Sequence, residues 1–388
     1  MGTIGGTLFI SIFLNKILSI KIPKVLIGEN IKQYRNENVT IILATRNEEN
    51  NIKNVLKSLI NQNSINFSII VTDRSDDKTL IFAENFLNTH EISTLVKAKN
   101  IKINLLPWND HLSYPKSKLG QIQHAFDNLI LGTDYIAFVD ADTYYPPNWL
   151  SSMVIGINKG YDAVTSGFLT SRGKGLIHHL DALDNLVVLI SGSVSVNLRL
   201  RGMLLGFNSL FRKTTFDEIN GYKGIEDAIV EDYALANKFF NQKKKIGFIN
   251  DIRSRVEIQP VDNPVQQKLR WSTANWKYSS FLPALFILGA NFVPMLLYLT
   301  SFSAFLISFI NPEMTTFLDF QITEVLSAGL IMGVIDLSVI FILTLELRIN
   351  PWIIPIYFVW INIIARPIVL LSFFKRKHVW KGQVYVAT

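Results

Sequence analysis

Two aspartates separated by one residue follow an apolar run in YIAFVDADTYYPPNW, residues 135–149. Side chains at positions i and i+2 of an extended chain point to the same side, so Asp140 and Asp142 repel each other unless a cation or a proton neutralises them. A hard divalent ion such as Mg²⁺ or Mn²⁺, completed by a diphosphate, would do so with few protein ligands. The alternative from these residues alone is that both aspartates cap the turn begun by Pro146 and Pro147.

Two other apolar runs also lead into polar residues. The run at residues 39–45 continues as ATRNEE, and the run at residues 67–73 continues as TDRSDD. In an open parallel sheet, ligands bind outside the carboxyl ends of the strands. We therefore expect these two ends and the end that carries Asp140 and Asp142 to face one site, where a nucleotide could lie.

Such a site requires strands and helices in alternation. Residues 36–260 alternate short β-branched runs with helical patterns, which is typical of an α/β domain. A helix is expected in EENNIKNVLKSLINQ because its apolar residues share one face, namely Ile52, Val55, Leu56 and Leu59. We predict strands at residues 39–45, 67–73, 102–108, 135–140 and 162–168.

The composition limits the class of protein. Of the 388 residues, 49% are hydrophobic and only 18% are charged, which is too apolar for an ordinary soluble enzyme. The net charge of +7 could suit nucleic acid, but the basic residues are scattered or flank apolar runs. That distribution favours a membrane surface and no nucleic-acid partner. The chain has no cysteine, so disulfides, thiolate metal sites and a cysteine nucleophile are excluded.

Long apolar windows lie toward the C-terminal end. Residues 281–310 contain no charged side chain, and a helix needs only about 20 apolar residues to cross a bilayer. Residues 325–347 and 352–374 are also long enough to span. Charges inside such windows are costly, so Asp336 and Arg366 are either functional candidates or a helix–helix pair.

Two other apolar segments are shorter. The run at residues 3–20 suits a single anchor or an interfacial helix, and the run inside residues 175–205 is too short to span. The second segment is either an interfacial helix that forms an acceptor entrance or a buried core helix. In chain order we expect a membrane anchor or interfacial helix at 1–24, an α/β domain at 36–260, an interfacial segment at 261–280, a transmembrane region at 281–374 and a basic tail at 375–388.

Basic residues predict the orientation in the cell membrane. Lysines follow the first apolar run, KRK follows the last at residues 375–377, and the loop expected at residues 311–324 has acidic residues but no Lys or Arg. The positive-inside rule then makes the α/β domain and the tail cytoplasmic and the loop external. Three full spans would place the tail outside, so we expect one window to be re-entrant or interfacial.

The polar strand ends resemble those of the family 2 glycosyltransferases of the GT-A type, and the resemblance covers nearly all of the chain. The family's first strand ends in proline-x-aromatic-asparagine-glutamate, where this chain has Ala44 and Arg46 at the proline and aromatic positions. The second ends in Asp-Asp-Gly-Ser-Thr-Asp, where this chain keeps Asp73 but has Arg74 at the glycine. The resemblance implies that Asp73 holds the nucleotide base.

Three further segments resemble motifs of the same family. KSKLGQIQHA is similar to its lysine-x-glycine-x-leucine-asparagine segment, which implies that Lys118 lies near the diphosphate. DAD matches its metal motif, with Asp140 toward the nucleotide and Asp142 on the ion. IVEDYALANKF resembles its Glu-Asp motif, which implies Asp232 as the general base beside Glu231. Taken alone, those last two residues could instead cap the following helix.

QQKLRW supplies the family pattern Gln-x-x-Arg-Trp. Arg270 offers a planar fork for a pyrophosphate, and Trp271 offers a flat apolar face for a sugar ring or a membrane edge. The resemblance implies Asp232 and Glu231 as catalytic residues and Asp140 and Asp142 as metal ligands. It implies a donor site made of Thr45, Arg46, Glu48, Asp73, Lys118, Asp140, Gln267, Arg270 and Trp271.

The resemblance implies a membrane-bound, inverting hexosyltransferase that uses Mn²⁺ or Mg²⁺. It would move a sugar from a nucleotide-sugar donor, expected to be a UDP-sugar, to a hydroxyl of a lipid acceptor, since the layout is similar to ceramide and related lipid glucosyltransferases. Within the class, the alternatives are a processive polysaccharide synthase and a polyprenyl-phosphate glycosyltransferase. From another class, the chain could be a transporter or scaffold whose domain only binds nucleotide. The sequence does not specify the sugar, the lipid or the oligomeric state.

Overall fold

The chain divides into two compact units. We call Leu18–Ser171 with Gly192–Pro260 the sheet unit, and Met1–Ile17, Arg172–Ser191 and Val261–Thr388 the helical unit. The computed structural model describes residues 37–386 except 64, 110–113, 116, 172–174, 198, 200–202, 227, 229, 262, 279–280, 311, 375–376 and 381–382. The expected N-terminal anchor at residues 1–24 lies outside the described residues.

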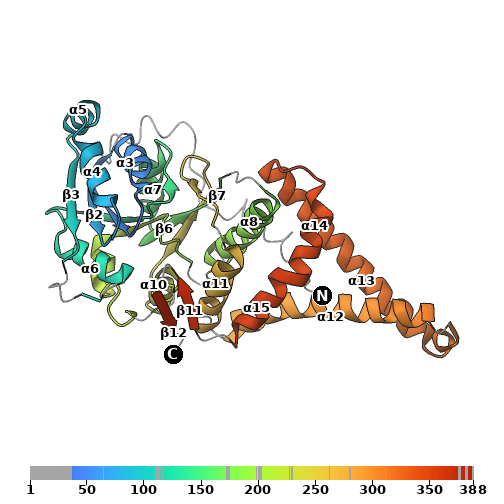
Figure 1. The fold of residues 1–388 in the computed structure, drawn as a ribbon. Helices are drawn as coiled ribbons and strands as arrows, with labels where there is room; N and C mark the ends of the chain where they lie inside the picture. The colour runs from blue at the N-terminus through green and yellow to red at the C-terminus, as the bar shows by residue number, and fades with distance from the viewer. Residues whose placement is uncertain are drawn as a thin grey trace. The chain divides into compact units, whose positions relative to one another are not determined.

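A seven-stranded sheet forms the centre of the sheet unit (Figure 1). Its apolar, β-branched runs are buried, which is typical of a sheet covered on both faces. The strands β3, β2, β1 and β4 are parallel, β8 is antiparallel to both of its neighbours, and β9 is parallel to β6. In sheet order the strands are β3 (Lys102–Pro107), β2 (Asn66–Asp73), β1 (Asn38–Thr45), β4 (Tyr135–Val139), β8 (Ser209–Arg212), β6 (Ala163–Ser166) and β9 (Ile246–Ile249).

The register brings the predicted strand ends to one edge. Thr45 pairs with Asp73, and Asp73 pairs with Pro107, so β1, β2 and β3 end side by side. The antiparallel strand β8 begins where β4 ends, because its first residue, Ser209, pairs with Phe138 near the end of β4. The loop that enters β8 therefore lies beside the residues that leave β4.

Four of the five predicted strands are confirmed, and the fifth is confirmed only in part. The run at residues 162–168 divides at Gly167 into β6 and β7 (Phe168–Thr170), because the Gly167 carbonyl accepts hydrogen bonds from Asn208 Nδ2 and the Val256 amide. Strand β7 joins a second sheet with β10 (Val256–Ile258) and β5 (Thr143–Tyr144). The large sheet is mixed, since β8 runs against its neighbours.

Helices cover both faces of the large sheet. In Figure 1, α3, α4 and α7 lie on one side of the strands, and α6 and α10 lie on the other. The four apolar residues predicted to share one face of α3 are all buried. The helices of this unit are α3 (Ile52–Ile60), α4 (Thr79–Leu87), α5 (His90–Ala98), α6 (Lys118–Asp127), α7 (Trp149–Ile157), α9 (Lys213–Glu218) and α10 (Glu231–Asn241).

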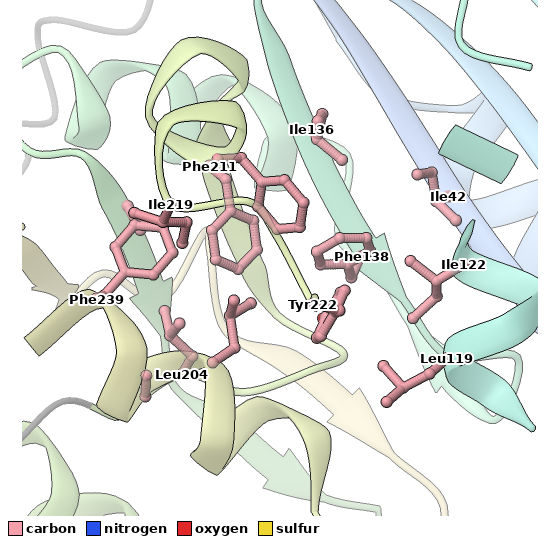
Figure 2. Packing of buried hydrophobic residues seen from close by; sticks show 14 of the residues in the cluster. Ile42, Leu119, Ile122, Ile136, Phe138, Leu204, Phe211, Ile219, Tyr222 and Phe239 are labelled. Carbon is pink, nitrogen blue, oxygen red and sulfur yellow. The ribbon is translucent and has the colours of Figure 1, made fainter. Parts of the chain in front are cut away.

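Aromatic residues fill the core under α6, α9 and α10. Figure 2 shows Phe211 and Phe138 among side chains from these helices and the sheet. The Phe211 ring lies 5.2 Å from the Phe138 ring, 5.8 Å from Phe216 and 5.7 Å from Phe239, measured between centroids. These contacts fix α9 and α10 against β4 and β8.

Long helices dominate the helical unit. Helix α8 (Leu176–Asn197) begins in it, and it continues with α11 (Pro264–Tyr278), α12 (Phe281–Ile310), α13 (Pro312–Leu347), α14 (Ile353–Trp360), the π-helix η2 (Ile361–Ala365) and α15 (Arg366–Ser372). A hairpin of β11 (Lys377–Trp380) and β12 (Gln383–Val386) follows. Among the described residues, four helical stretches are long and apolar enough to cross a membrane: 176–197, 291–310, 323–345 and 353–372.

Two expectations for this region are wrong. The apolar segment within residues 175–205 is long enough to span, because α8 extends over 22 residues. No loop occupies residues 312–324, because α13 begins at Pro312, a residue that suits the first position of a helix. The three apolar windows at residues 281–310, 325–347 and 352–374 are confirmed as helical.

The two charges inside the apolar windows pair with each other. Arg366 Nη2 donates to Asp336 Oδ2 at 2.8 Å, and both side chains are buried. The Tyr298 hydroxyl donates to the same carboxylate oxygen at 2.9 Å. This arrangement joins α12, α13 and α15, so the helix–helix reading of Asp336 and Arg366 is confirmed.

Replacement of Phe211 by alanine should destabilise the sheet unit. The side chain is buried among three other rings, so its loss should lower the free energy of unfolding by about 3–5 kcal/mol. Phe240→Ala is the matched control, because this ring is 37% exposed and its loss should cost less than about 1 kcal/mol. Thermal unfolding in detergent compares the two variants, and equal melting temperatures would contradict this packing.

Candidate active site

One lysine links the two predicted acidic motifs. Lys118 Nζ lies 2.8 Å from Asp140 Oδ1 and 2.9 Å from Glu231 Oε1. The three side chains are 33%, 30% and 17% exposed, in that order, so water reaches the cluster without filling it. Burial lowers the pKa of Lys118, but the Asp140 and Glu231 charges outweigh it and raise that pKa well above its ordinary value. The ammonium therefore stays charged and is shared by one carboxylate from each motif.

Lys118 is held at the first residue of α6. Ser117 caps this helix, because its Oγ accepts a hydrogen bond from the Gly120 amide at 3.2 Å. A Cβ on Gly120 would lie 1.8 Å from the Pro115 carbonyl oxygen, so only glycine allows this close approach. A cation at a helix N-terminus is unfavourable toward the helix dipole, and the two carboxylates offset this cost.

Asp140 and Asp142 leave the end of β4, as predicted. The turn at Pro146 and Pro147 leads into α7, which begins at Trp149 with Asn148 at the N-cap position. The Asp140 amide donates to the Tyr145 hydroxyl at 3.1 Å, and Asp142 Oδ1 lies 3.5 Å from Thr143 Oγ1. Asp140 thus faces Lys118, and Asp142 lies two residues further along a loop that Tyr145 anchors.

Glu231 and Asp232 occupy the first two positions of α10, and Val230 is the N-cap residue. The interpretation of the pair as N-cap residues is therefore wrong. Asp232 Oδ2 accepts from the Gly206 amide at 2.9 Å, and Asp232 Oδ1 accepts from the Tyr233 amide at 2.8 Å. Two backbone donors orient this carboxylate, and the helix N-terminus favours its negative charge.

Asp73 lies at the far end of the same edge. Its Oδ1 accepts hydrogen bonds from Thr45 Oγ1 and Ser75 Oγ, both at 2.6 Å, and the side chain is 5% exposed. The Arg74 guanidinium lies 6.0 Å from the Trp108 ring centroid, and Trp108 follows β3. The ends of β1, β2 and β3 thus form one wall around Asp73.

Glu48 and Arg46, the other residues predicted to bind the donor at the end of the first strand, differ in their exposure to solvent. Glu48 is buried, and its Oε2 accepts from Asn51 Nδ2 at 2.8 Å, so it supports the start of α3. Arg46 is partly exposed. The structure therefore gives Glu48 a local structural contact, and a role of either residue in donor binding stays a prediction.

Gln267, Arg270 and Trp271 lie on α11 in the helical unit. Gln267 is buried, whereas Arg270 and Trp271 are partly exposed. The neighbouring Lys268 is buried and lies 2.5 Å from Asp181 Oδ1 of α8. A buried ion pair thus fixes α11 against α8 within this unit, and the donor contacts of the three motif residues stay predictions.

The sequence patterns missed several residues that shape the site. Gly206 and Tyr145 hold the acidic residues by hydrogen bonds, and Gln121 Nε2 donates to the carbonyl oxygens of Thr45 and Thr72 at 2.8 and 2.9 Å. Gln121 therefore ties α6 to the ends of β1 and β2. The sequence carries only weak signals for these residues, because the residue type of a single glycine or tyrosine in a loop does not indicate a chemical role.

The two aspartates that follow β4, Asp140 and Asp142, offer carboxylate oxygens as ligands for a metal ion. Among the described residues, no group of three or more His, Asp or Glu side chains is placed to hold a metal ion. Mg²⁺ and Mn²⁺ at phosphate-transfer sites commonly use one or two carboxylates and complete their shell with phosphate oxygens and water. The pair Asp140 and Asp142 therefore fits such an ion when a diphosphate is also present.

Two family models match the chain. Residues 40–219 match "Glycosyl transferase family 2", and residues 135–365, more than half of the chain, match "Glycosyl transferase family group 2". No protein of curated function matches the sequence.

Solved structures also match the chain at low sequence identity. Residues 1–349 of S. aureus TarS, alone and with UDP-GlcNAc, are 14% identical with a TM-score of 0.41, and 90% of this chain and 96% of that chain are covered. The glucosyl-3-phosphoglycerate synthase of Mycobacterium tuberculosis, with Mn²⁺ and UDP-glucose, is 16% identical with a TM-score of 0.40. That match covers 66% of this chain and 86% of the synthase.

Replacement of Lys118 by methionine should destabilise the sheet unit. Asp140 and Glu231 would lose their shared counter-charge, at a cost of about 1–2 kcal/mol near pH 7 after allowance for solvent screening. Because the two carboxylates raise the pKa of Lys118, the ammonium stays charged in mildly alkaline solution, and the cost should be the same at about pH 9 as at about pH 7.

Melting curves at neutral and mildly alkaline pH measure this effect. Lys213→Met is the control, because Lys213 pairs with the exposed Asp217 in an i,i+4 contact worth a few tenths of a kcal/mol. A Lys118→Met variant as stable as the wild type at pH 7 would contradict the bridge.

Proposed function

Because the chain belongs to the glycosyl transferase family group 2, we propose that this glycosyltransferase is a membrane-bound, inverting enzyme that moves a sugar from a nucleotide-sugar donor to a hydroxyl of a lipid acceptor. The observation that carries the proposal is the Lys118 bridge between Asp140 and Glu231. It unites the strand end suited to a diphosphate with the acidic pair suited to an acceptor hydroxyl.

The donor would lie along the carboxyl ends of β1, β2 and β4. Asp73 at one end would receive the base, and Lys118 at the other would lie near the diphosphate, whose charge a lysine ammonium can match. Asp140 and Asp142 would hold Mn²⁺ or Mg²⁺, which when bound would stabilise negative charge on the departing diphosphate. A UDP-sugar is the proposed donor.

Asp232 is the proposed general base. An acceptor hydroxyl is a poor nucleophile until its proton is removed, and a carboxylate within hydrogen-bond reach can accept that proton. The Gly206 and Tyr233 amides hold the Asp232 oxygens in place. A single displacement would then form the new bond on the face of the sugar opposite the diphosphate, which inverts the anomeric configuration.

The surface of the helical unit supports a lipid acceptor. Only 6% of the candidate span Asn291–Ile310 is buried inside the protein. Large apolar side chains on this helix are exposed, including Phe302 at 61% and Phe309 at 80%. Exposed apolar area of this kind is typical of a surface in contact with lipid. In this setting, Trp271 would lie at the membrane edge.

The acceptor class can be tested with membranes that contain the protein. Incubation with Mn²⁺ and a panel of labelled UDP-sugars, followed by extraction into organic solvent, should yield one discrete labelled lipid, and EDTA should abolish it. Membranes without the protein are the control. A ladder of product sizes would contradict a single transfer and would indicate a polysaccharide synthase. Label on a polyprenyl phosphate would show that the acceptor is a phosphate and not a hydroxyl. Absence of UDP release from every donor would contradict transfer from UDP-sugars.

Asp232→Asn should lower kcat by about 10²–10⁴-fold, because general-base catalysis contributes rate factors of that size. Donor binding, measured by calorimetry, should remain within about twofold of the wild type, since Asp232 acts on the acceptor. Asp217→Asn, at an exposed position of α9, is the matched control and should keep full activity. An unchanged kcat in Asp232→Asn would remove this residue from the base role.

A further inference from the structure

Tyr145 connects the loop of Asp140 to the loop that enters β8. Its hydroxyl accepts a hydrogen bond from the Asp140 amide at 3.1 Å and donates one to the Phe207 carbonyl at 2.8 Å. The side chain has 0% exposure, so water cannot replace either partner. The two loops are thus joined through a single oxygen atom.

The second loop also carries the donor that orients Asp232. Gly206, next to Phe207, donates its amide to Asp232 Oδ2 at 2.9 Å. A continuous path therefore runs from the Asp140 amide through the Tyr145 hydroxyl and the backbone of residues 206–207 to Asp232.

The base of this path is rigid. Trp149 Nε1 donates to Asn208 Oδ1 at 2.8 Å, and Asn208 Nδ2 donates to the Gly167 and Ser254 carbonyls at 2.8 and 3.2 Å. The Tyr145 and Trp149 rings meet edge to face, with centroids 4.6 Å apart. Buried groups thus hold Asn208, the residue at which this loop enters β8.

Both hydrogen bonds of the Tyr145 hydroxyl are made at once, one as acceptor and one as donor. A neutral phenol can donate to the Phe207 carbonyl and accept from the Asp140 amide at the same time, which a phenolate could not do.

We propose that Tyr145 is a positioning residue that couples departure of the diphosphate to deprotonation of the acceptor. The inference rests on the proposed function, in which Asp140 serves the donor and Asp232 serves the acceptor. In transfer, Asp232 accepts the hydroxyl proton while the acceptor oxygen bonds to the anomeric carbon. The bond from that carbon to the diphosphate oxygen breaks, and its electron pair leaves with the diphosphate. The Tyr145 hydroxyl touches no reacting atom and fixes the two loops that must act together.

Slow hydrolysis of the donor provides the distinguishing measurement. Water is small and can attack the anomeric carbon without the alignment that a bulky acceptor needs. Loss of the Tyr145 hydroxyl should therefore harm transfer more than hydrolysis. A purely structural role would lower both rates in the same proportion, because it would reduce only the amount of folded enzyme.

Tyr145→Phe in the full-length, detergent-solubilised protein tests the inference, with UDP release and labelled product measured on the same sample. We expect kcat for transfer to fall at least tenfold, the donor KM to stay within about twofold, and the ratio of hydrolysis to transfer to rise at least fivefold. Tyr135→Phe is the matched control, because this buried hydroxyl contacts Asn158 and Arg212 at the other end of β4. Its ratio should equal that of the wild type.

An unchanged ratio in Tyr145→Phe, or an equal rise in Tyr135→Phe, would overturn the inference. Trp149→Phe provides a second test if Tyr145→Phe does not fold, because it removes the hydrogen bond to Asn208 together with part of the ring that packs on Tyr145, and it should raise the same ratio. A wild-type protein that neither transfers nor hydrolyses any donor would instead refute the proposed function.

Discussion

The Lys118 ammonium between Asp140 and Glu231 is the interaction on which the rest of the site depends. Without it, two carboxylates from different motifs would meet at one edge of the sheet and would lose the counter-charge that they share. With it, the ends of one strand and two helices are held together, because Asp140 follows β4, Lys118 begins α6 and Glu231 begins α10. The bridge also leaves Asp232, the next residue of α10, to be oriented by backbone amides.

The mixed sheet explains how these groups come together. A parallel neighbour of β4 would begin at the opposite end of the strand, and its preceding loop would lie far from Asp140. Because β8 is antiparallel to β4, its first residue pairs near the end of β4. The residues just before it, Gly206 and Phe207, then reach Asp232 and Tyr145. The reversal of one short strand thus brings the residues proposed to serve the donor and the acceptor into a single network within the sheet unit.

The sequence was informative where residue type and spacing carry a direct physical signal. The buried runs that became β1 and β4 are apolar and β-branched throughout, and the acidic pairs at 140/142 and 231/232 are unusual enough to suggest chemistry. Strand β8 is only four residues long, and its position depends on contacts with distant strands, so no local pattern could reveal it. The division of the run at residues 162–168 had the same cause, since Asn208 and Val256 supply the hydrogen bonds that draw Gly167 out of the large sheet.

The membrane-like windows were the easiest feature to predict, because an uncharged run of thirty residues has few other uses. The partners of the two charged residues inside these windows could not be predicted from the sequence, and the structure pairs Asp336 with Arg366. The roles of Tyr145, Gly206 and Gln121 also needed it, since each acts through a hydrogen bond to a backbone group far away in the chain. Residue type alone does not indicate such partners.

A double-mutant cycle between Lys118→Met and Glu231→Gln tests the central interaction most directly. Removal of either partner should destabilise the sheet unit at pH 7, and removal of both should cost less than the sum of the single changes. The account predicts a coupling free energy of at least about 0.5 kcal/mol, the size expected for residues in direct contact. Strictly additive effects on the free energy of unfolding would show that Lys118 and Glu231 do not interact in solution and would contradict the account.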